Sequence, residues 1–161
     1  MSFSILLVED EAPKRAHIEN FLKTLSLELI VDCVSSVNSA LDYLDHNLPD
    51  LMLLDMSLPT FSIGERESGG RPQGFGGIEV LRHMSFSGYS CPTIVITGYE
   101  AFLRETGNAV NLSQIREELA SEFPTTFRGV LHYNSTYDEW KLRLVDALVE
   151  FGVVDQERGW F

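Results

Sequence analysis

Residues 50–59 decide the fold, and they read Asp50-Leu51-Met52-Leu53-Leu54-Asp55-Met56-Ser57-Leu58-Pro59. Four apolar residues follow one another without a polar break and then meet a carboxylate, Asp55. A continuous apolar run bounded by turn formers is typical of a strand that is buried on both faces of a parallel sheet. Asp55 would then lie at the carboxyl end of this strand, where open α/β sheets bind their ligands.

The start of the chain repeats this arrangement. The apolar run Ser4–Val8 ends in three acids, Glu9, Asp10 and Glu11. Pro13 suits the first turn of a helix, because proline lacks the N–H that this turn leaves unpaired. An apolar stripe predicts that the helix continues with its inner face formed by Ala16, Phe21, Leu22 and Leu25.

Strand and helix patterns alternate along the rest of the chain. Each parallel crossover needs a helix, so this alternation predicts an α/β fold with a doubly wound, five-stranded parallel sheet and helices on both faces. The predicted strands are residues 4–8, 28–34, 50–55, 93–97 and 129–133.

Two segments depart from this regular alternation. Residues 60–77 hold six glycines, which predicts an inserted Gly-rich loop. Residues 99–127 are longer than an ordinary crossover; a helix ends before Pro124, and residues 99–110 are expected to form either a short helix or an irregular approach to it. In the last helix, Thr136 and Glu139 have the spacing of a capping box.

Length and composition favour one domain over residues 1–161, with 44% hydrophobic residues to form its core. The net charge of −12 argues against direct nucleic acid binding, which needs clustered Lys and Arg. No apolar run approaches the roughly 20 residues that span a membrane, and the first residues do not read as a signal peptide. We therefore expect a cytoplasmic protein.

Three predicted strands end in side chains that can carry chemistry: Glu9 and Asp10, then Asp55, then Thr97. In a doubly wound sheet these ends converge on one crevice, where the carboxylates repel one another. A divalent cation with oxygen ligands relieves this repulsion, and Mg²⁺ is the expected cofactor. Asp55 could then act as a carboxylate nucleophile that forms an acyl phosphate, with Thr97 donating a hydrogen bond to a phosphoryl oxygen.

Four motifs together resemble the receiver domain of two-component response regulators. The resemblance covers residues 3 to about 152 and implies the flavodoxin-like strand order 2-1-3-4-5. The motifs are Ile5–Glu11, Pro49–Pro59, Gly77–Leu81 and Pro92–Gly98.

The resemblance implies a role for each of these side chains. Asp55 is the phospho-acceptor, and Glu9 and Asp10 are the acidic pair that positions Mg²⁺. Asp55 and the backbone carbonyl of Ser57 complete the protein ligands, and Thr97 is the switch hydroxyl. The implied partners are a histidine kinase or a histidine phosphotransfer protein, together with a downstream protein that the sequence does not identify.

The sequence departs from the family at three places. The family lysine after the fifth strand is missing, because Tyr133 or Asn134 falls there. The aromatic switch position is Val130, and the loop after Pro59 is longer than usual. Either of two loop arginines could supply the missing cation, namely Arg66 or Arg71.

Three hypotheses follow. The leading one is a stand-alone receiver in a phosphorelay, phosphorylated on Asp55 with Mg²⁺ bound; its only catalysis would be self-phosphorylation from a phosphodonor and slow autodephosphorylation. The alternative is a pseudo-receiver that binds a protein partner independently of phosphorylation. The third is a phosphatase, which the sequence disfavours because Ser57 stands where such enzymes place a second aspartate. A homodimer stays open in each case.

Overall fold

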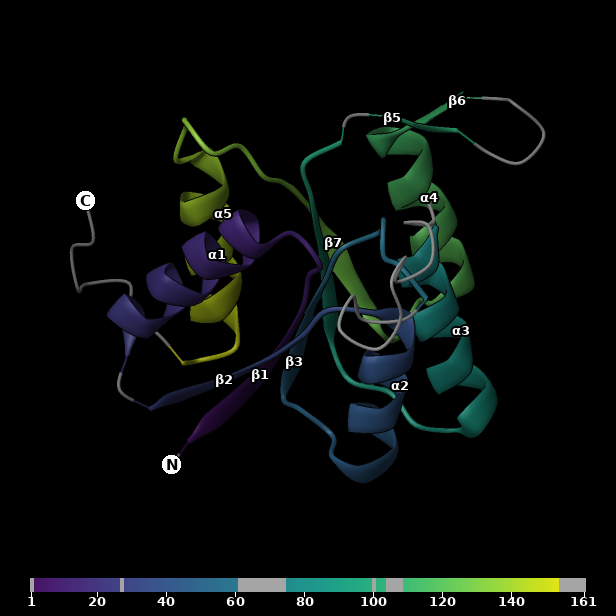
Figure 1. The fold of residues 1–161 in the computed structure, drawn as a ribbon, viewed down its shortest axis with the longest axis horizontal. Coiled ribbons are helices and arrows are strands. Elements are labelled where there is room, and N and C mark those ends of the chain that lie inside the picture. Colours follow the sequence, from purple (N-terminus) through teal and green to yellow (C-terminus); the bar gives the residue numbers. More distant parts are fainter. Residues whose placement is uncertain (1, 27, 61–74, 100, 104–108, 154–161) are drawn as a thin grey trace.

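The computed structural model describes residues 2–26, 28–60, 75–99, 101–103 and 109–153. A five-stranded parallel sheet in the order β2-β1-β3-β4-β7 forms its centre, as Figure 1 shows. The loop arginines Arg66 and Arg71 lie outside the described residues. The strands of the sheet are β1 (Phe3–Val8), β2 (Leu29–Val34), β3 (Leu51–Leu54), β4 (Thr93–Thr97) and β7 (Phe127–His132).

Helices cover both faces of the sheet. Two helices pack on one face, α1 (Ala12–Leu25) and α5 (Glu139–Glu150), and three pack on the other, α2 (Val37–His46), α3 (Gly76–Ser87) and α4 (Leu112–Glu122) (Figure 1). The predicted fold class and strand order are therefore confirmed, with β7 as the fifth strand of the sheet.

The two apolar cores follow from the strand pleat, which points successive side chains to opposite faces. In β1, Ile5 and Leu7 join the core under α1 and α5, whereas Leu6 and Val8 join the core under α2, α3 and α4. The residues of β3 alternate in the same way, and all four are fully buried. This burial on both faces explains why the central strand is a continuous apolar run.

The segment that follows β4 differs from the expectation. We expected a short helix or an irregular approach over residues 99–110, and the structure has an antiparallel pair of short strands, β5 (Ala101–Leu103) and β6 (Ala109–Asn111). Asn111 then caps α4, because its side chain accepts a hydrogen bond from the Gln114 N–H. Hydrogen bonding between these strands provides the backbone partners that an irregular approach would lack.

The start of the last helix also differs. The prediction of a capping box at Thr136 and Glu139 is wrong, since α5 begins at Glu139 and no side chain caps its first turn. Asn134 instead accepts hydrogen bonds from the N–H groups of Thr136 and Tyr137, at 2.7 and 3.1 Å. An Asx turn of this kind competes with helix formation for the same backbone donors.

The inner face of α1 is displaced from the predicted stripe. Ala16 is exposed, and the buried positions are Lys14, Ile18, Leu22 and Leu25. This set still follows helical spacing, but it begins with a lysine. The helix therefore directs a cationic side chain towards the sheet.

Candidate functional site

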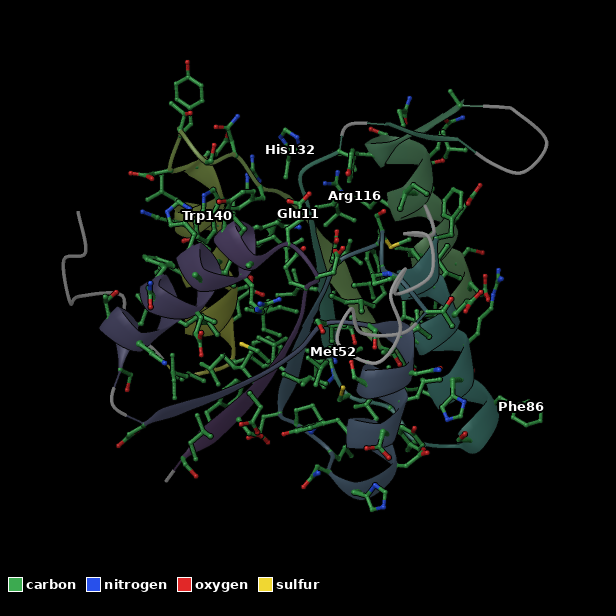
Figure 2. All side chains as sticks on the ribbon, viewed as in Figure 1. Glu11, Met52, Phe86, Arg116, His132 and Trp140 are labelled. Carbon is green, nitrogen blue, oxygen red and sulfur yellow. The ribbon has the colours of Figure 1, made fainter. Side chains whose placement is uncertain are left out.

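The register of the sheet brings the predicted site residues to one edge. Val8 of β1 pairs with Leu54 of β3, so the residues that follow them, Glu9 and Asp55, lie level with one another. The Asp55 N–H donates to the Val8 carbonyl at 3.0 Å, which holds the end of β3 against β1. Figure 2 labels Glu11 in the turn after β1, at the same edge of the sheet as His132 at the end of β7.

The three predicted carboxylates form one cluster. One oxygen from each of Glu9, Asp10 and Asp55 lies within 4.8 Å of the others. Glu9 and Asp55 are buried, whereas Asp10 is half-buried. The sequence therefore identified a real cluster, and its oxygen-only donor set suits Mg²⁺.

The polar atoms of the cluster also fit a cation. Glu9 Oε1 and Asp55 Oδ1 are buried; both lie beside the Lys14 ammonium, but neither receives a well-aligned hydrogen bond within the described residues. Buried polar atoms without such partners are costly, and a bound ion is one way to satisfy them. The residues that could hold Mg²⁺ are Glu9, Asp10 and Asp55, to which the resemblance adds the Ser57 carbonyl; Ser57 lies two residues beyond Asp55 and is half-buried.

Lys14 is the charged residue that the sequence analysis missed. Its Nζ lies 2.5 Å from Glu9 Oε1 and 3.3 Å from Asp55 Oδ1, and it donates to the Ile96 carbonyl at 2.9 Å. The side chain is only 5% exposed. A lysine at this depth needs compensating charge, and the two carboxylates provide it.

The electrostatics of the cluster reflect burial and mutual repulsion. Burial, with a further contribution from the Asp55 charge, raises the pKa of Glu9. Burial also raises the pKa of Asp55, although the Lys14 ammonium opposes this shift. Burial alone would lower the pKa of Lys14, but the charges of Asp55 and Glu9 outweigh it and raise that pKa. Because the pKa values of Glu9 and Asp55 are raised, a metal ion that binds these carboxylates would displace protons from them.

A cavity of about 320 Å³ opens above Asp55. Asp55 and Lys14 contribute charged groups to its wall, and residues after β4 and β7 contribute the opposite side. Its lining also includes Glu11, Gly98, Tyr99, Tyr133, Asn134 and Ser135. A cavity of this size accommodates a phosphoryl group and ordered water beside the Asp55 carboxylate.

Thr97 is fully buried at the end of β4, and its Oγ1 accepts a hydrogen bond from the Tyr99 N–H at 3.2 Å. The strand end is fixed on its other side by the Tyr133 N–H, which donates to the Thr97 carbonyl at 2.8 Å. Thr97 therefore lies where the sequence analysis placed it, at the same sheet edge as Asp55.

An aromatic group occupies the end of β7, where the resemblance leads one to expect a lysine. The Tyr133 hydroxyl lies 2.8 Å from His17 Nδ1, and the Lys14 Nζ lies 5.7 Å from the centre of the Tyr133 ring. Trp140 packs against both Tyr133 and His17, with ring centres 5.2 Å apart in each case. Val130, at the position of the aromatic switch, is buried in the core.

Two glycines allow α3 to begin directly beside Asp55. A Cβ on Gly77 would lie 2.5 Å from the Asp55 carbonyl oxygen, and one on Gly76 would lie 2.7 Å from the Leu58 carbonyl oxygen. The Gly77 N–H donates to the Met56 carbonyl at 2.9 Å. The start of α3 therefore supports the backbone that carries Asp55.

No helix in the described ranges is long and apolar enough to cross a membrane. Among curated proteins, the chain is 28% identical over 102 residues to the Detocs response regulatory protein DtcB of Enterobacter cloacae, which covers 63% of this chain and 67% of that protein. It is 25% identical over 144 residues to the uncharacterized protein y4jR of Sinorhizobium fredii, covering 88% and 94% of the two chains.

Solved structures share the fold at low sequence identity. The signal receiver domain of a putative Luxo repressor protein from Vibrio parahaemolyticus is 16% identical with a TM-score of 0.62, covering 95% of this chain and 93% of that one. The response regulator TrrA from Thermotoga maritima, solved in complex with Mg²⁺ and BeF, is 20% identical with a TM-score of 0.58, covering 88% and 96%.

Residues 5–113 match the family described as "Response regulator receiver domain". This match spans the carboxylate cluster, the central strand and β4, and it agrees with the fold. The chain belongs to the response regulator receiver domain family.

Proposed function

We propose that this receiver accepts a phosphoryl group on Asp55, with Mg²⁺ held by Glu9, Asp10, Asp55 and the Ser57 carbonyl. The observation that carries the proposal is the placement of the Asp55 carboxylate: it is buried, it lies within the three-carboxylate cluster, and it lines the cavity at the sheet edge. Related chains with Mg²⁺ in their structures support the choice of metal.

The chemistry is a phosphoryl transfer to a carboxylate. An Asp55 carboxylate oxygen attacks the phosphorus of the donor, and the bond from phosphorus to the donor's imidazole nitrogen or carboxylate oxygen breaks with its electron pair. An acyl phosphate results; attack of water on its phosphorus later restores the Asp55 carboxylate and releases inorganic phosphate. Bound Mg²⁺ supplies charge neutralisation for the phosphoryl oxygens.

The side chains of the protein have separate tasks in this reaction. Asp55 is the nucleophile, and Glu9 and Asp10 hold the negative charge that a divalent cation requires. Thr97 would donate its hydroxyl hydrogen to a phosphoryl oxygen, and it can keep accepting from the Tyr99 N–H while it does so, because a hydroxyl both donates and accepts. The phosphodonor is a histidine kinase or a histidine phosphotransfer protein, and the protein that responds is a downstream partner.

The test is Mg²⁺-dependent phosphorylation of the full chain by acetyl phosphate, followed by intact mass and by sensitivity of the product to hydroxylamine. We expect one phosphoryl group on the wild type, none on Asp55→Asn, and wild-type labelling of Asp50→Asn. Asp50 is a matched control, since it lies at the other end of the same strand and pairs with Ser4. An unlabelled wild type in the presence of both Mg²⁺ and donor would refute the proposal.

A pseudo-receiver that binds its partner regardless of phosphorylation is the second candidate. Two observations favour it: Tyr133 and Asn134 follow β7 where the family lysine is expected, and Val130 stands at the position of the switch aromatic. It predicts the same partner affinity for the wild type and for Asp55→Asn, with and without Mg²⁺. An unlabelled wild type would favour this candidate, and a partner affinity that changes when Asp55 is phosphorylated would contradict it.

A further inference from the structure

The family places a phosphate-binding lysine after the last strand of the sheet, and this chain has no lysine there. We infer that Lys14, at the start of α1, is the phosphoryl-binding cation of this receiver. The inference rests on the proposed function of Asp55 and concerns a different residue, whose contribution can fail while the proposed function stands.

The first argument is position. Lys14 reaches Glu9 and Asp55, the two buried members of the cluster, and it lines the same cavity as Asp55. Its ammonium thus lies beside the atoms on which the acyl phosphate would form. Arg15, its neighbour in α1, donates instead to the Glu9 carbonyl at 2.9 Å.

The second argument is the number of hydrogen-bond donors. An ammonium has three N–H groups, and Lys14 has three neighbouring acceptors: Glu9, Asp55 and the Ile96 carbonyl. The contact to Asp55 is the longest of the three, and Asp55 is the residue that would carry the phosphoryl group. The donor that faces Asp55 is therefore the one that can transfer to a phosphoryl oxygen, while the other two keep the side chain in place.

The third argument is charge. Three carboxylates and one ammonium leave a formal charge of minus two, which a divalent cation neutralises. When the Asp55 carboxylate becomes an acyl phosphate, the negative charge at this point increases, and the ammonium is already buried beside it. A preorganised cation in a water-poor site stabilises such charge more than an exposed one does.

The fourth argument is the aromatic group at the end of β7. Tyr133, His17 and Trp140 pack together there, and Trp140 Nε1 donates to the Asn134 carbonyl at 3.1 Å. Tyr133 thus stands at a position where the family lysine is expected, and its ring lies beside the Lys14 ammonium, 5.7 Å from the ring centre to Nζ. The lysine function has thus moved from the last strand to the first helix.

The experiment measures two affinities of the full chain, one for Mg²⁺ and one for fluoroberyllate in saturating Mg²⁺. Both are followed by Trp140 fluorescence in a Trp160→Phe background, because Trp140 is buried beside Tyr133. In Lys14→Met we expect fluoroberyllate affinity and the rate of labelling by acetyl phosphate to fall about ten- to hundredfold, as for loss of one charged hydrogen bond. Mg²⁺ affinity should stay the same or rise, because a competing cation has been removed.

Two further variants make the result specific. Lys23→Met removes an exposed lysine from the same helix, paired only with Glu19 among the described residues, and should behave as wild type. Lys14→Met with Tyr133→Lys returns a lysine to the end of β7 and should recover part of the fluoroberyllate affinity. A purely structural Lys14 would instead lower both affinities together and would not be rescued.

If Lys14→Met does not fold, the ¹⁵N resonance of the Lys14 ammonium in the wild type is the measurement, and it should shift when fluoroberyllate is added with Mg²⁺. Wild-type fluoroberyllate affinity in Lys14→Met, or an unmoved Lys14 resonance, would overturn the inference. Either result counts against Lys14 only if the wild type binds fluoroberyllate and is labelled by acetyl phosphate. A wild type that neither binds fluoroberyllate nor is labelled would refute the proposed function itself.

Discussion

Individual residues at this site are best understood through their burial. Glu9 and Asp55 are almost entirely removed from solvent, and Lys14 between them is scarcely more exposed. Isolated buried charges are strongly unfavourable, so the three side chains depend on one another. This dependence links the chemistry of the site to the stability of the domain.

The pH dependence of Mg²⁺ binding follows from the carboxyl groups. Burial raises the pKa of Glu9 to about 8 and that of Asp55 to about 6, and it also raises the pKa of Asp10. In the metal-free protein these groups hold protons more tightly than in the unfolded chain. Their contribution to stability is therefore complete below the unfolded pKa, near 4, and is lost as the pH rises through the folded pKa values.

Magnesium should reverse this loss, because it binds the ionised carboxylates and displaces their protons. We expect the Mg²⁺-induced rise in melting temperature to be small near pH 5.5 and to grow steadily up to pH 8. Thermal unfolding at several pH values, with Mg²⁺ or with a chelator, measures this difference. Asp50→Asn should keep the trend and Glu9→Gln should weaken it; a Mg²⁺ effect independent of pH would contradict the assignment of the cluster.

The sequence could predict Glu9, Asp10, Asp55 and Thr97 because each lies at the carboxyl end of a recognisable strand or just after it. It could not predict Lys14, because a lysine near three acids at the start of a helix normally faces solvent. The available signal was helical spacing: Lys14 precedes Ile18 and Leu22 by four and eight residues, on one face of α1. Choosing Ala16 as the start of the stripe moved the predicted face away from the lysine.

At the scale of elements, the junction of β3 with α3 controls the position of Asp55. The chain passes from Asp55 through the described residues to Thr60, and α3 returns at Gly76 against the same turn. Gly77 touches the backbone of both Asp55 and Met56, with no space for a Cβ. Because both partners in this contact are backbone, neither can move aside as a flexible side chain would to make room for a Cβ.

We therefore expect Gly77→Ala to destabilise the protein by about 1 to 3 kcal/mol, the usual cost of overpacking. Alanine is a better helix former than glycine by up to about 1 kcal/mol, but the clash is with backbone atoms and outweighs that gain. Because the Asp55 backbone must shift, Mg²⁺ affinity should also fall. Urea unfolding and Mg²⁺ titration measure the two effects.

Gly98→Ala is the matched control for this substitution. Within the described part of the chain, a Cβ there would meet only the Tyr133 carbonyl oxygen, at 4.0 Å, so the stability of Gly98→Ala should stay close to that of the wild type. Equal stability of the two alanine variants would show that the start of α3 can move away from Asp55.

Elements were predictable where apolar periodicity determines them, and less so where local hydrogen bonds do. The five sheet strands follow from buried apolar runs in the sequence. The start of α5 was mispredicted because Asn134 accepts a hydrogen bond from the Thr136 N–H. In the predicted capping box, the Glu139 side chain would have accepted from this same N–H. The β5–β6 pair lacks a long apolar run, so nothing in the sequence pattern distinguished it from an irregular segment.

At the scale of the whole molecule, the charges gathered at the site lower the stability of the folded domain. The sheet edge gathers three carboxylates around one ammonium, in a chain whose net charge is already −12. Sites of this kind commonly lower stability, because the charges required for function are unfavourable in the resting fold. The raised pKa of Asp55 also indicates that the ionised carboxylate is unfavourable here, since burial favours its neutral form.

Replacing the phospho-acceptor should consequently stabilise the domain. In metal-free buffer at pH 8 we expect Asp55→Asn to raise the free energy of unfolding by about 1 to 3 kcal/mol, because it removes a carboxylate that burial has made unfavourable while keeping its shape. The gain is limited, since Lys14 loses one of its two ion pairs and keeps the shorter one to Glu9. Saturating Mg²⁺ should narrow or reverse this difference in the free energy of unfolding between Asp55→Asn and the wild type, because only the wild type retains all three carboxylates.

Chemical denaturation of both proteins, with a chelator and with Mg²⁺, measures the four free energies of unfolding. An Asp55→Asn variant less stable than the wild type without metal would mean that the Lys14–Asp55 attraction exceeds the cost of burying this carboxylate.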